Sequence, residues 1–129
     1  MRKIIALMLG MVIFLTGCAS QNTDGTYKQI TVDKAVEIMN EEPDYIILDV
    51  RTQGEYESGH ILGAICIPNE SIGDEQPKLL PDKNQLILVY CRSGNRSKQA
   101  AQKLSQMGYT NIMEFGGIND WQGETETGS

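Results

Sequence analysis

Cysteine and histidine are scarce in this sequence, which has three cysteines and one histidine among 129 residues. Cys18, Cys66 and Cys91 are too few and too unevenly spaced to form a disulfide framework. They also lack the paired CxxC spacing of a zinc site, and His60 alone does not supply the missing ligands. We therefore expect no structural metal, and a single domain that is stabilised by an ordinary hydrophobic core.

Basic residues are outnumbered as well. The chain has 11 lysines and arginines against 17 aspartates and glutamates, which gives a net charge of −6. Nucleic acids and anionic lipid headgroups select basic surfaces, so we expect neither as a partner. Any anion that this chain binds must be held by a local positive site.

Only the N-terminus carries a long apolar run, which covers 4–15 and follows Arg2 and Lys3. A basic head, a short apolar run and small residues are typical of a secretory signal peptide. The run is shorter than the roughly 20 apolar residues of a membrane-spanning helix. Leu15-Thr16-Gly17-Cys18 resembles the lipobox of bacterial lipoproteins. In that family the cysteine is diacylated and becomes the first residue of the mature protein.

This resemblance predicts a signal peptide over 1–17, a lipidated Cys18, and a flexible tether over 18–28. Cleavage removes two basic residues, so the net charge falls from −6 to −8. Two acyl chains hold a soluble domain at a membrane, here outside the cytoplasm. The alternatives are an ordinary signal peptide that contains a cysteine, or an uncleaved anchor.

Apolar runs alternate with helical spacings along the rest of the chain. The sequence predicts strands over 45–50, 64–67, 86–90 and 111–115. It predicts helices over 31–40, 53–58 and 97–107, and a last short helix that ends at Trp121. This alternation indicates an α/β fold with a central, mostly parallel sheet and helices on both faces. We expect one domain over 29–123 and a disordered tail over 124–129.

The segment from Val89 to Ser97 carries the strongest chemical signal, because a buried strand delivers the chain to Cys91, a small polar loop and a helix start. Backbone N–H groups in such a loop, together with a helix N-terminus, form an anion cradle. A thiolate held there is stabilised, so the pKa of Cys91 should fall while its sulfur stays exposed. Gly94 allows the tight backbone that the loop needs.

Two arginines, Arg92 and Arg96, flank this loop and are placed to attract an oxyanion. The ordinary alternative is a buried structural cysteine with both arginines in solvent. We favour a functional Cys91, because strand, cysteine, glycine, arginine and helix start occur in the order that builds an electropositive pocket.

The chain resembles single-domain members of the rhodanese family from about Gln29 to Gly123. Four stretches in the family's order carry the resemblance: Leu48-Asp49-Val50-Arg51 with Glu55-Tyr56, Gly59 to Ala64 followed by Ile67-Pro68, the loop Cys91 to Ser97, and Gly116-Gly117-Ile118 with Trp121. Four residues separate Cys91 from Arg96, as in rhodanese-type sulfurtransferases. Related phosphatases and arsenate reductases have five, so their chemistry is disfavoured.

The resemblance implies a rhodanese-like fold and a sulfurtransferase that works without a metal or organic cofactor. Cys91 would take sulfur from a small anionic donor such as thiosulfate and pass it, as a persulfide, to cyanide or another thiol. The loop residues that would bind donor and persulfide are Arg92, Ser93, Gly94, Asn95, Arg96 and Ser97. Nothing demands a partner subunit, so we expect a monomer. The alternative function is a non-enzymatic rhodanese-like binding module at the cell envelope.

Five further residues receive weaker assignments. Asp49 is expected to support the site, either by ordering the catalytic loop, as the family resemblance suggests, or by capping the turn at Gln53. The ordinary interpretation of Arg51 is that it forms an ion pair with Glu55, which contributes little stability if it is exposed. His60 is expected to have a structural role. Cys66 is expected to pack as a small apolar residue, and the alternative is that it forms a disulfide with Cys91. Trp121 is expected in the core, or else at the pocket mouth.

Overall fold

The structure is a computed structural model and describes residues 26–129. The predicted signal peptide over 1–17, the lipidated Cys18 and most of the tether lie outside the described residues. Within 26–129, none of the helices combines the length and the apolar character that crossing a membrane requires.

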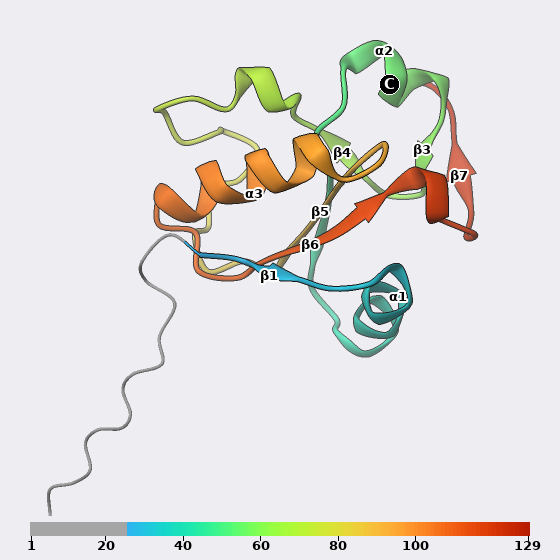
Figure 1. Ribbon diagram of the computed structural model, residues 1–129, viewed down its shortest axis with the longest axis horizontal. Coiled ribbons are helices and arrows are strands. Elements are labelled where there is room, and N and C mark those ends of the chain that lie inside the picture. The colour runs from blue at the N-terminus through green and yellow to red at the C-terminus, as the bar shows by residue number, and fades with distance from the viewer. Residues whose placement is uncertain (1–25) are drawn as a thin grey trace, which may run out of the picture.

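Five parallel strands form the central sheet (Figure 1). All four strand pairs are parallel, and Ile46–Asp49 pairs in register with Ile87–Tyr90 at the centre. In spatial order the strands are β1 (Lys28–Gln29), β6 (Ile112–Gly117), β5 (Ile87–Cys91), β2 (Ile46–Asp49) and β4 (Ile65–Cys66).

Helices cover both faces of this sheet, because its central strands are apolar on both sides. Alternate residues of β2 and β5 point to opposite faces, so the apolar residues divide into two cores. α3 (Asn95–Gln106) packs on one face with Leu48 and Val89, and η2 (Asn69–Ser71) lies beside it. α1 (Val32–Glu41) and α2 (Gln53–Ser58) pack on the other face with Ile47 and Leu88 (Figure 1). The predicted α/β fold is confirmed.

The end of the chain is ordered, so the prediction of a disordered tail after Gly123 is wrong. Thr125–Glu126 forms β7, which pairs antiparallel with β3 (His60–Ile61). The Glu126 side chain also accepts a hydrogen bond from the Gly63 backbone. Backbone pairing with a distant strand orders this polar segment, which has no apolar pattern to predict a strand.

Two boundaries near Cys91 differ from the prediction, and both shorten the turn between strand and helix. β5 runs on to include Cys91, and α3 begins at Asn95 instead of Ser97. Gly94 caps the helix with a φ of +120°, in the left-handed region that favours glycine. The turn between strand and helix is therefore shorter than expected, which brings the helix N-terminus closer to the cysteine. A last 3-10 turn, η3 (Ile118–Asp120), lies where the final short helix was predicted, and Trp121 is its C-cap.

Candidate active site

Cys91 is the last residue of β5, at the carboxyl edge of the sheet, and its side chain belongs to the core under α3. Ligands of open parallel sheets bind at this edge. The residue is only 1% exposed, so the expectation of an exposed sulfur is wrong. The loop after it folds over the thiol, and Gly94 is buried while Arg92 and Ser93 are exposed.

Backbone amides point at the Cys91 sulfur, as the anion cradle requires. The Gly94 N–H donates to Sγ at 3.0 Å, and the Ser97 hydroxyl lies 3.5 Å from it. Burial raises the pKa of the Cys91 thiol and is the largest single influence on it. Hydrogen bonds from the Ser97 hydroxyl and from the amides of Ser97, Gly94 and Ser93 act in the opposite direction and together lower the pKa below its ordinary value.

Gly117 lies where β6 packs against the loop that follows Cys91. It pairs in register with Cys91 across a β-bulge between β5 and β6. A Cβ on Gly117 would lie 1.9 Å from the carbonyl oxygen of Arg92 and 2.7 Å from the amide nitrogen of Ser93. That same carbonyl accepts a hydrogen bond from the Asn119 amide at 3.2 Å. Only glycine therefore allows β6 to approach the loop this closely.

Arg96 is held by Glu55 and does not lie free over the loop. The two side chains form a bidentate ion pair with distances of 2.7 and 3.2 Å, and both are about one-third exposed. The hydrogen bond from Arg96 is the main cause that lowers the pKa of Glu55 to about 2. Glu55 is fixed in turn by Thr52, the N-cap of α2, whose amide donates to it. The expected pair between Arg51 and Glu55 is therefore wrong.

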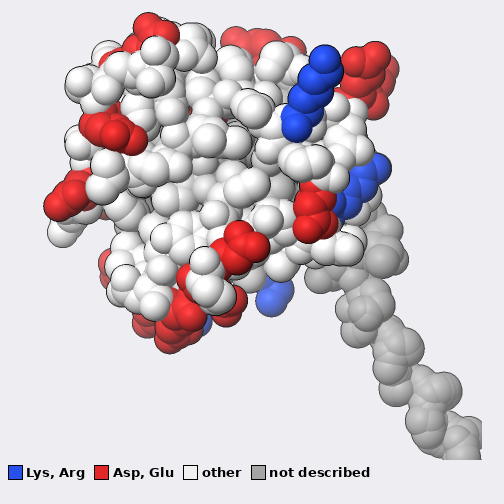
Figure 2. All heavy atoms as spheres, turned by 180° about the vertical axis from the view of Figure 1, so that it is seen from behind, with Lys and Arg blue, Asp and Glu red and all other residues white. Residues whose placement is uncertain are grey.

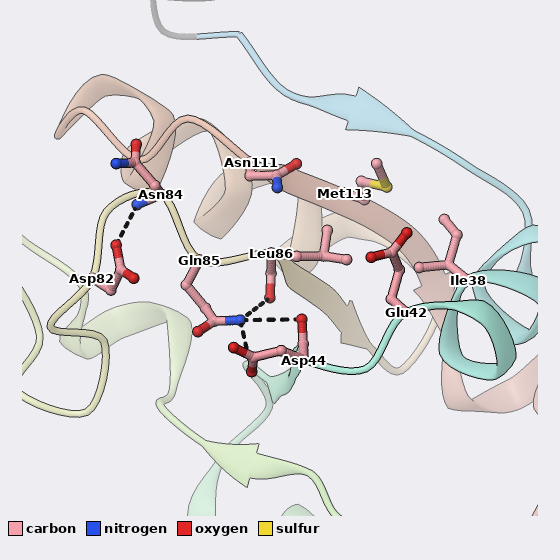
Figure 3. A pocket seen from close by; sticks show the side chains of 9 residues that line it. All are labelled: Ile38, Glu42, Asp44, Asp82, Asn84, Gln85, Leu86, Asn111 and Met113. Carbon is pink, nitrogen blue, oxygen red and sulfur yellow. Dashed lines mark hydrogen bonds between the residues drawn. The ribbon is translucent and has the colours of Figure 1, made fainter.

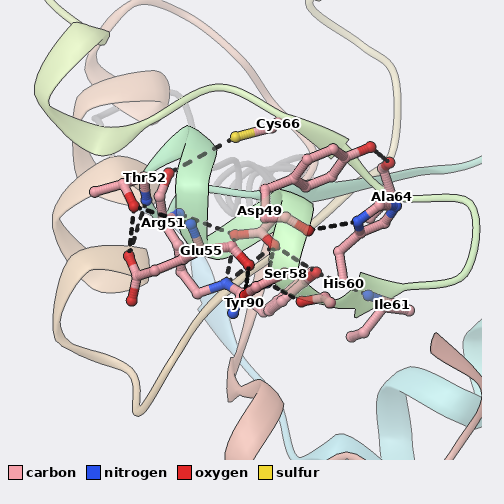
Figure 4. A network of polar contacts seen from close by, with 12 residues as sticks. Asp49, Arg51, Thr52, Glu55, Ser58, His60, Ile61, Ala64, Cys66 and Tyr90 are labelled. Carbon is pink, nitrogen blue, oxygen red and sulfur yellow. Dashed lines mark hydrogen bonds and ion pairs between the residues drawn. The ribbon is translucent and has the colours of Figure 1, made fainter. Parts of the chain in front are cut away.

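Arg51 pairs with Asp49 instead, in a buried network beneath the site (Figure 4). Their closest atoms are 2.6 Å apart, and Arg51 also donates to the Gly59 carbonyl at 2.7 Å. The Tyr90 hydroxyl donates to Asp49 at 2.7 Å and accepts from the Ile61 amide. Asp49 makes none of its hydrogen bonds to Gln53 or to the catalytic loop. Asp49 and Arg51 thus act structurally, and through Tyr90 they fix the strand that ends at Cys91.

Two other candidates lie on the far side of the sheet from the Cys91 thiol. His60 stacks on Tyr56, binds its carbonyl and lies 3.3 Å from the Glu126 carboxylate. Trp121 packs near Phe115, in the core under α1. Both are structural, as expected, and Trp121 does not line the mouth of the site.

Cys66 packs against the core that faces α1, opposite to the Cys91 thiol. Strand β2 also separates the two residues, which places their Cα atoms roughly 10 Å apart from the spacing of strands. That exceeds the range of a disulfide. Burial raises the pKa of Cys66 to about 11. The hypothesis of a disulfide with Cys91 is therefore wrong for this conformation.

Glu114 is the residue at this site that the sequence prediction missed. It is 2% exposed and lies on β6, with one carboxylate oxygen 2.5 Å from the Ser97 hydroxyl. Its only signal in the sequence is a charge inside the otherwise apolar stretch 112–115.

A hollow of about 400 Å³ opens at the opposite edge of the sheet (Figure 3). Its lining includes Leu86 and Asn111, which precede β5 and β6, and it contains no residue of the catalytic loop. Gln85 bridges there to Asp44. No cluster of three or more metal-ligating side chains occurs within residues 26–129. The described site brings together the Cys91 sulfur, its amide donors and the buried carboxyl of Glu114.

Comparisons with known proteins agree with this fold. The model of the family described as "Rhodanese-like domain" matches residues 31–124. The chain is 41% identical over 73 residues to thiosulfate sulfurtransferase PspE of Escherichia coli (strain K12), which covers 57% of this chain and 70% of PspE. It is 33% identical over 102 residues to thiosulfate sulfurtransferase GlpE of Coxiella burnetii, which covers 78% of this chain and 92% of GlpE.

A solved structure described as "rhodanese with anions from E. coli" has the same fold. It superimposes with a TM-score of 0.60 and 37% sequence identity, over 65% of this chain and 99% of that one.

Proposed function

The chain belongs to the rhodanese family, and we propose that it transfers sulfane sulfur by way of a persulfide on Cys91. The observation that carries the proposal is the Gly94 N–H, which donates to the Cys91 sulfur at 3.0 Å in a loop between a parallel strand and a helix N-terminus. Donors aimed at a sulfur stabilise it when it is negatively charged, as a thiolate or as a persulfide anion.

The reaction has two halves. In the first, the Cys91 thiolate attacks the outer sulfur of a donor such as thiosulfate. A new S–S bond forms at Cys91, the S–S bond of thiosulfate breaks, and sulfite leaves with that electron pair. In the second half, cyanide or a thiol attacks the terminal sulfur, and Cys91 leaves as the thiolate. Thiosulfate is chosen as donor because two similar proteins are named thiosulfate sulfurtransferases.

Because Cys91 is 1% exposed, a donor reaches the sulfur only when the loop over it moves. Arg92, which is exposed on this loop, supplies the positive charge that attracts the donor. Local charge matters here because the chain is acidic overall, and acidic side chains are spread over the face in Figure 2.

The experiment is an assay of purified protein with thiosulfate and cyanide that follows thiocyanate. We expect turnover in the unmodified protein, no turnover above background in Cys91→Ser, and unchanged turnover in the matched control Cys66→Ser. Turnover that survives in Cys91→Ser would remove this thiol from the mechanism. A lack of turnover in the unmodified protein would favour the non-enzymatic binding module, and hydrolysis of phosphate esters would favour phosphatase chemistry.

We further propose that the protein works outside the cytoplasm, as a monomer that a diacylated Cys18 attaches to a membrane. The basis is the lipobox-like sequence that ends the N-terminal apolar run. In bacterial cells, the unmodified protein should sediment with membranes and carry the mass of two acyl chains. Cys18→Ser should lose both properties. A membrane-bound Cys18→Ser protein with an uncleaved N-terminus would show that the segment is a simple anchor.

A further inference from the structure

Glu114 is a buried carboxyl group that the persulfide cycle described above does not use. It lies on β6 opposite Val89 of β5, on the face of the sheet that α3 covers. Its neighbours in the strand include the buried apolar residues Ile112 and Phe115, and Glu114 itself is 2% exposed. A carboxylate in such a place is costly unless it is paired or hydrogen-bonded.

Two neutral donors satisfy it. One of its oxygens, Oε2, accepts from the Ser97 hydroxyl at 2.5 Å and from the Gly116 amide at 2.8 Å. Among the salt bridges found within residues 26–129, none involves Glu114. The carboxyl is therefore held in place, but no cation neutralises it.

Ser97 connects this carboxyl to the nucleophile. Its hydroxyl oxygen lies 2.5 Å from Glu114 and 3.5 Å from the Cys91 sulfur. A hydroxyl has a single proton, so Ser97 donates to one acceptor at a time, and the carbonyl oxygens of Gly94 and Gly116 also lie within reach, at 3.0 and 3.3 Å. When it donates to Glu114, its lone pair accepts the Cys91 S–H, and when it donates to the Cys91 thiolate, it accepts from a protonated Glu114.

We propose that Glu114 is the internal proton acceptor for Cys91 and acts on it through Ser97. The Cys91 S–H bond breaks and its proton forms a new bond to Ser97 Oγ. The original Ser97 O–H bond breaks, and that proton passes to Glu114 Oε2. The products are a thiolate and a neutral carboxyl, with no net change of charge or oxidation state. This inference rests on the proposed function, because it explains how the same buried thiol becomes a nucleophile.

The relay also follows from charge. A thiolate and a carboxylate that lie on either side of one hydroxyl repel each other. The charged and titratable groups on the elements packed against this face come from β1, the loop, α3, η2 and the turn after α3: Tyr27, Lys28, Arg92, Arg96, Lys98, Lys103, Glu70 and Tyr109. Lys103 donates to the Asn69 carbonyl. Lys28, Arg92 and Lys98 are exposed, and Arg96 is paired with Glu55. α1 covers the opposite face.

The test is the rate at which iodoacetamide alkylates Cys91, measured from acid to alkaline pH by mass spectrometry of the peptide that contains it. A coupled pair releases its two protons in separate steps. The unmodified protein should therefore show two rises in rate, separated by about one pH unit or more. Glu114→Gln keeps the size and the hydrogen-bonding capacity but accepts no proton, so its profile should show a single rise.

Ser97→Ala removes the link between the two groups and should also give a single rise, which keeps the test decisive if Glu114→Gln does not fold. Glu41→Gln, at the exposed end of α1, is the matched control and should keep both rises. A single rise in the unmodified protein, or two rises that persist in Glu114→Gln, would overturn the relay and leave Glu114 as a structural cap of the Gly116 turn.

Alkylation needs no sulfur donor, so the two proposals fail separately. Two rises without thiocyanate formation would support the relay and refute the sulfurtransferase. Thiocyanate formation with a single rise would do the opposite.

Discussion

Substitution of Gly117 by alanine tests whether the close packing of β6 against the catalytic loop shapes the site. The new Cβ would lie 1.9 Å from the Arg92 carbonyl oxygen, whereas ordinary contact begins at 3.4 Å. The loop must therefore retreat by about 1.5 Å, and the nearby atoms are backbone atoms that cannot rotate aside. This movement displaces the amides that face the Cys91 sulfur.

A misplacement of about 1 Å in a catalytic group costs about 100-fold in rate, so we expect Gly117→Ala to lose at least that much sulfurtransferase turnover. Overpacking costs about 1–3 kcal/mol of folding stability, and about 4–8 °C in Tm for each kcal/mol in a domain of this size. The assays are thiocyanate formation and thermal unfolding. Gly73→Ala is the control, because its Cβ would meet no atom within 4 Å and the backbone there is not left-handed.

The decisive comparison is between turnover and stability. If Gly117→Ala kept turnover within twofold of the unmodified protein, the loop would not need its present position, and the argument from the amide cradle would fail. If Gly73→Ala lost as much turnover as Gly117→Ala, the effect would not be specific to the site.

Three further predictions concern the surroundings of the site. Asp49→Asn leaves the Arg51 guanidinium buried without its anion, so urea denaturation should show a loss of about 3–5 kcal/mol, and a loss under 1 kcal/mol would contradict the buried pair. Because the pKa of Glu55 is lowered from 4.5 to about 2, its pair with Arg96 stabilises the fold above pH 4.5 and is lost as pH falls towards 2. Acid titration should therefore destabilise the unmodified protein more steeply in that window than Glu55→Gln, and equal slopes would refute this. Alkylation of Cys66 should keep rising with pH until about 11, and a plateau near neutrality would show that its thiol is not buried as described.

The strand, loop and helix around Cys91 could be predicted from sequence because their signals are local. An apolar run, a glycine that takes φ of +120° and a helical spacing lie within a few residues of one another. The long-range pairs around the site could not be predicted in this way. Arg96 meets Glu55, and Tyr90 meets Asp49, across 41 positions each, so their pairing depends on how β2 and β5 lie side by side.

Charge at unusual positions was the signal that the prediction passed over. Arg51 and Glu55 are four residues apart, a spacing that makes an ion pair reasonable for an exposed helix. Both instead bind partners that lie elsewhere, because Arg51 is drawn into the buried network with Asp49. Glu114 in an apolar strand is a stronger hint, since a buried carboxyl without a nearby cation has a cost that some interaction must offset.

The burial of Cys91 and its reactivity follow from the same feature of the loop. Amides stabilise a charged sulfur only when they surround it closely, and a loop that surrounds the sulfur also excludes the donor. The exposed part of the loop, Arg92 and Ser93, accepts a backbone hydrogen bond from Asn119 and directs the Ser93 amide at the sulfur, so these are contacts that opening must break. Once sulfur is loaded, the side chain is longer by one S–S bond of about 2 Å. The terminal sulfur of the persulfide then lies farther from the core than the thiol does, so we expect acceptors to meet the loaded site more readily than donors meet the empty one.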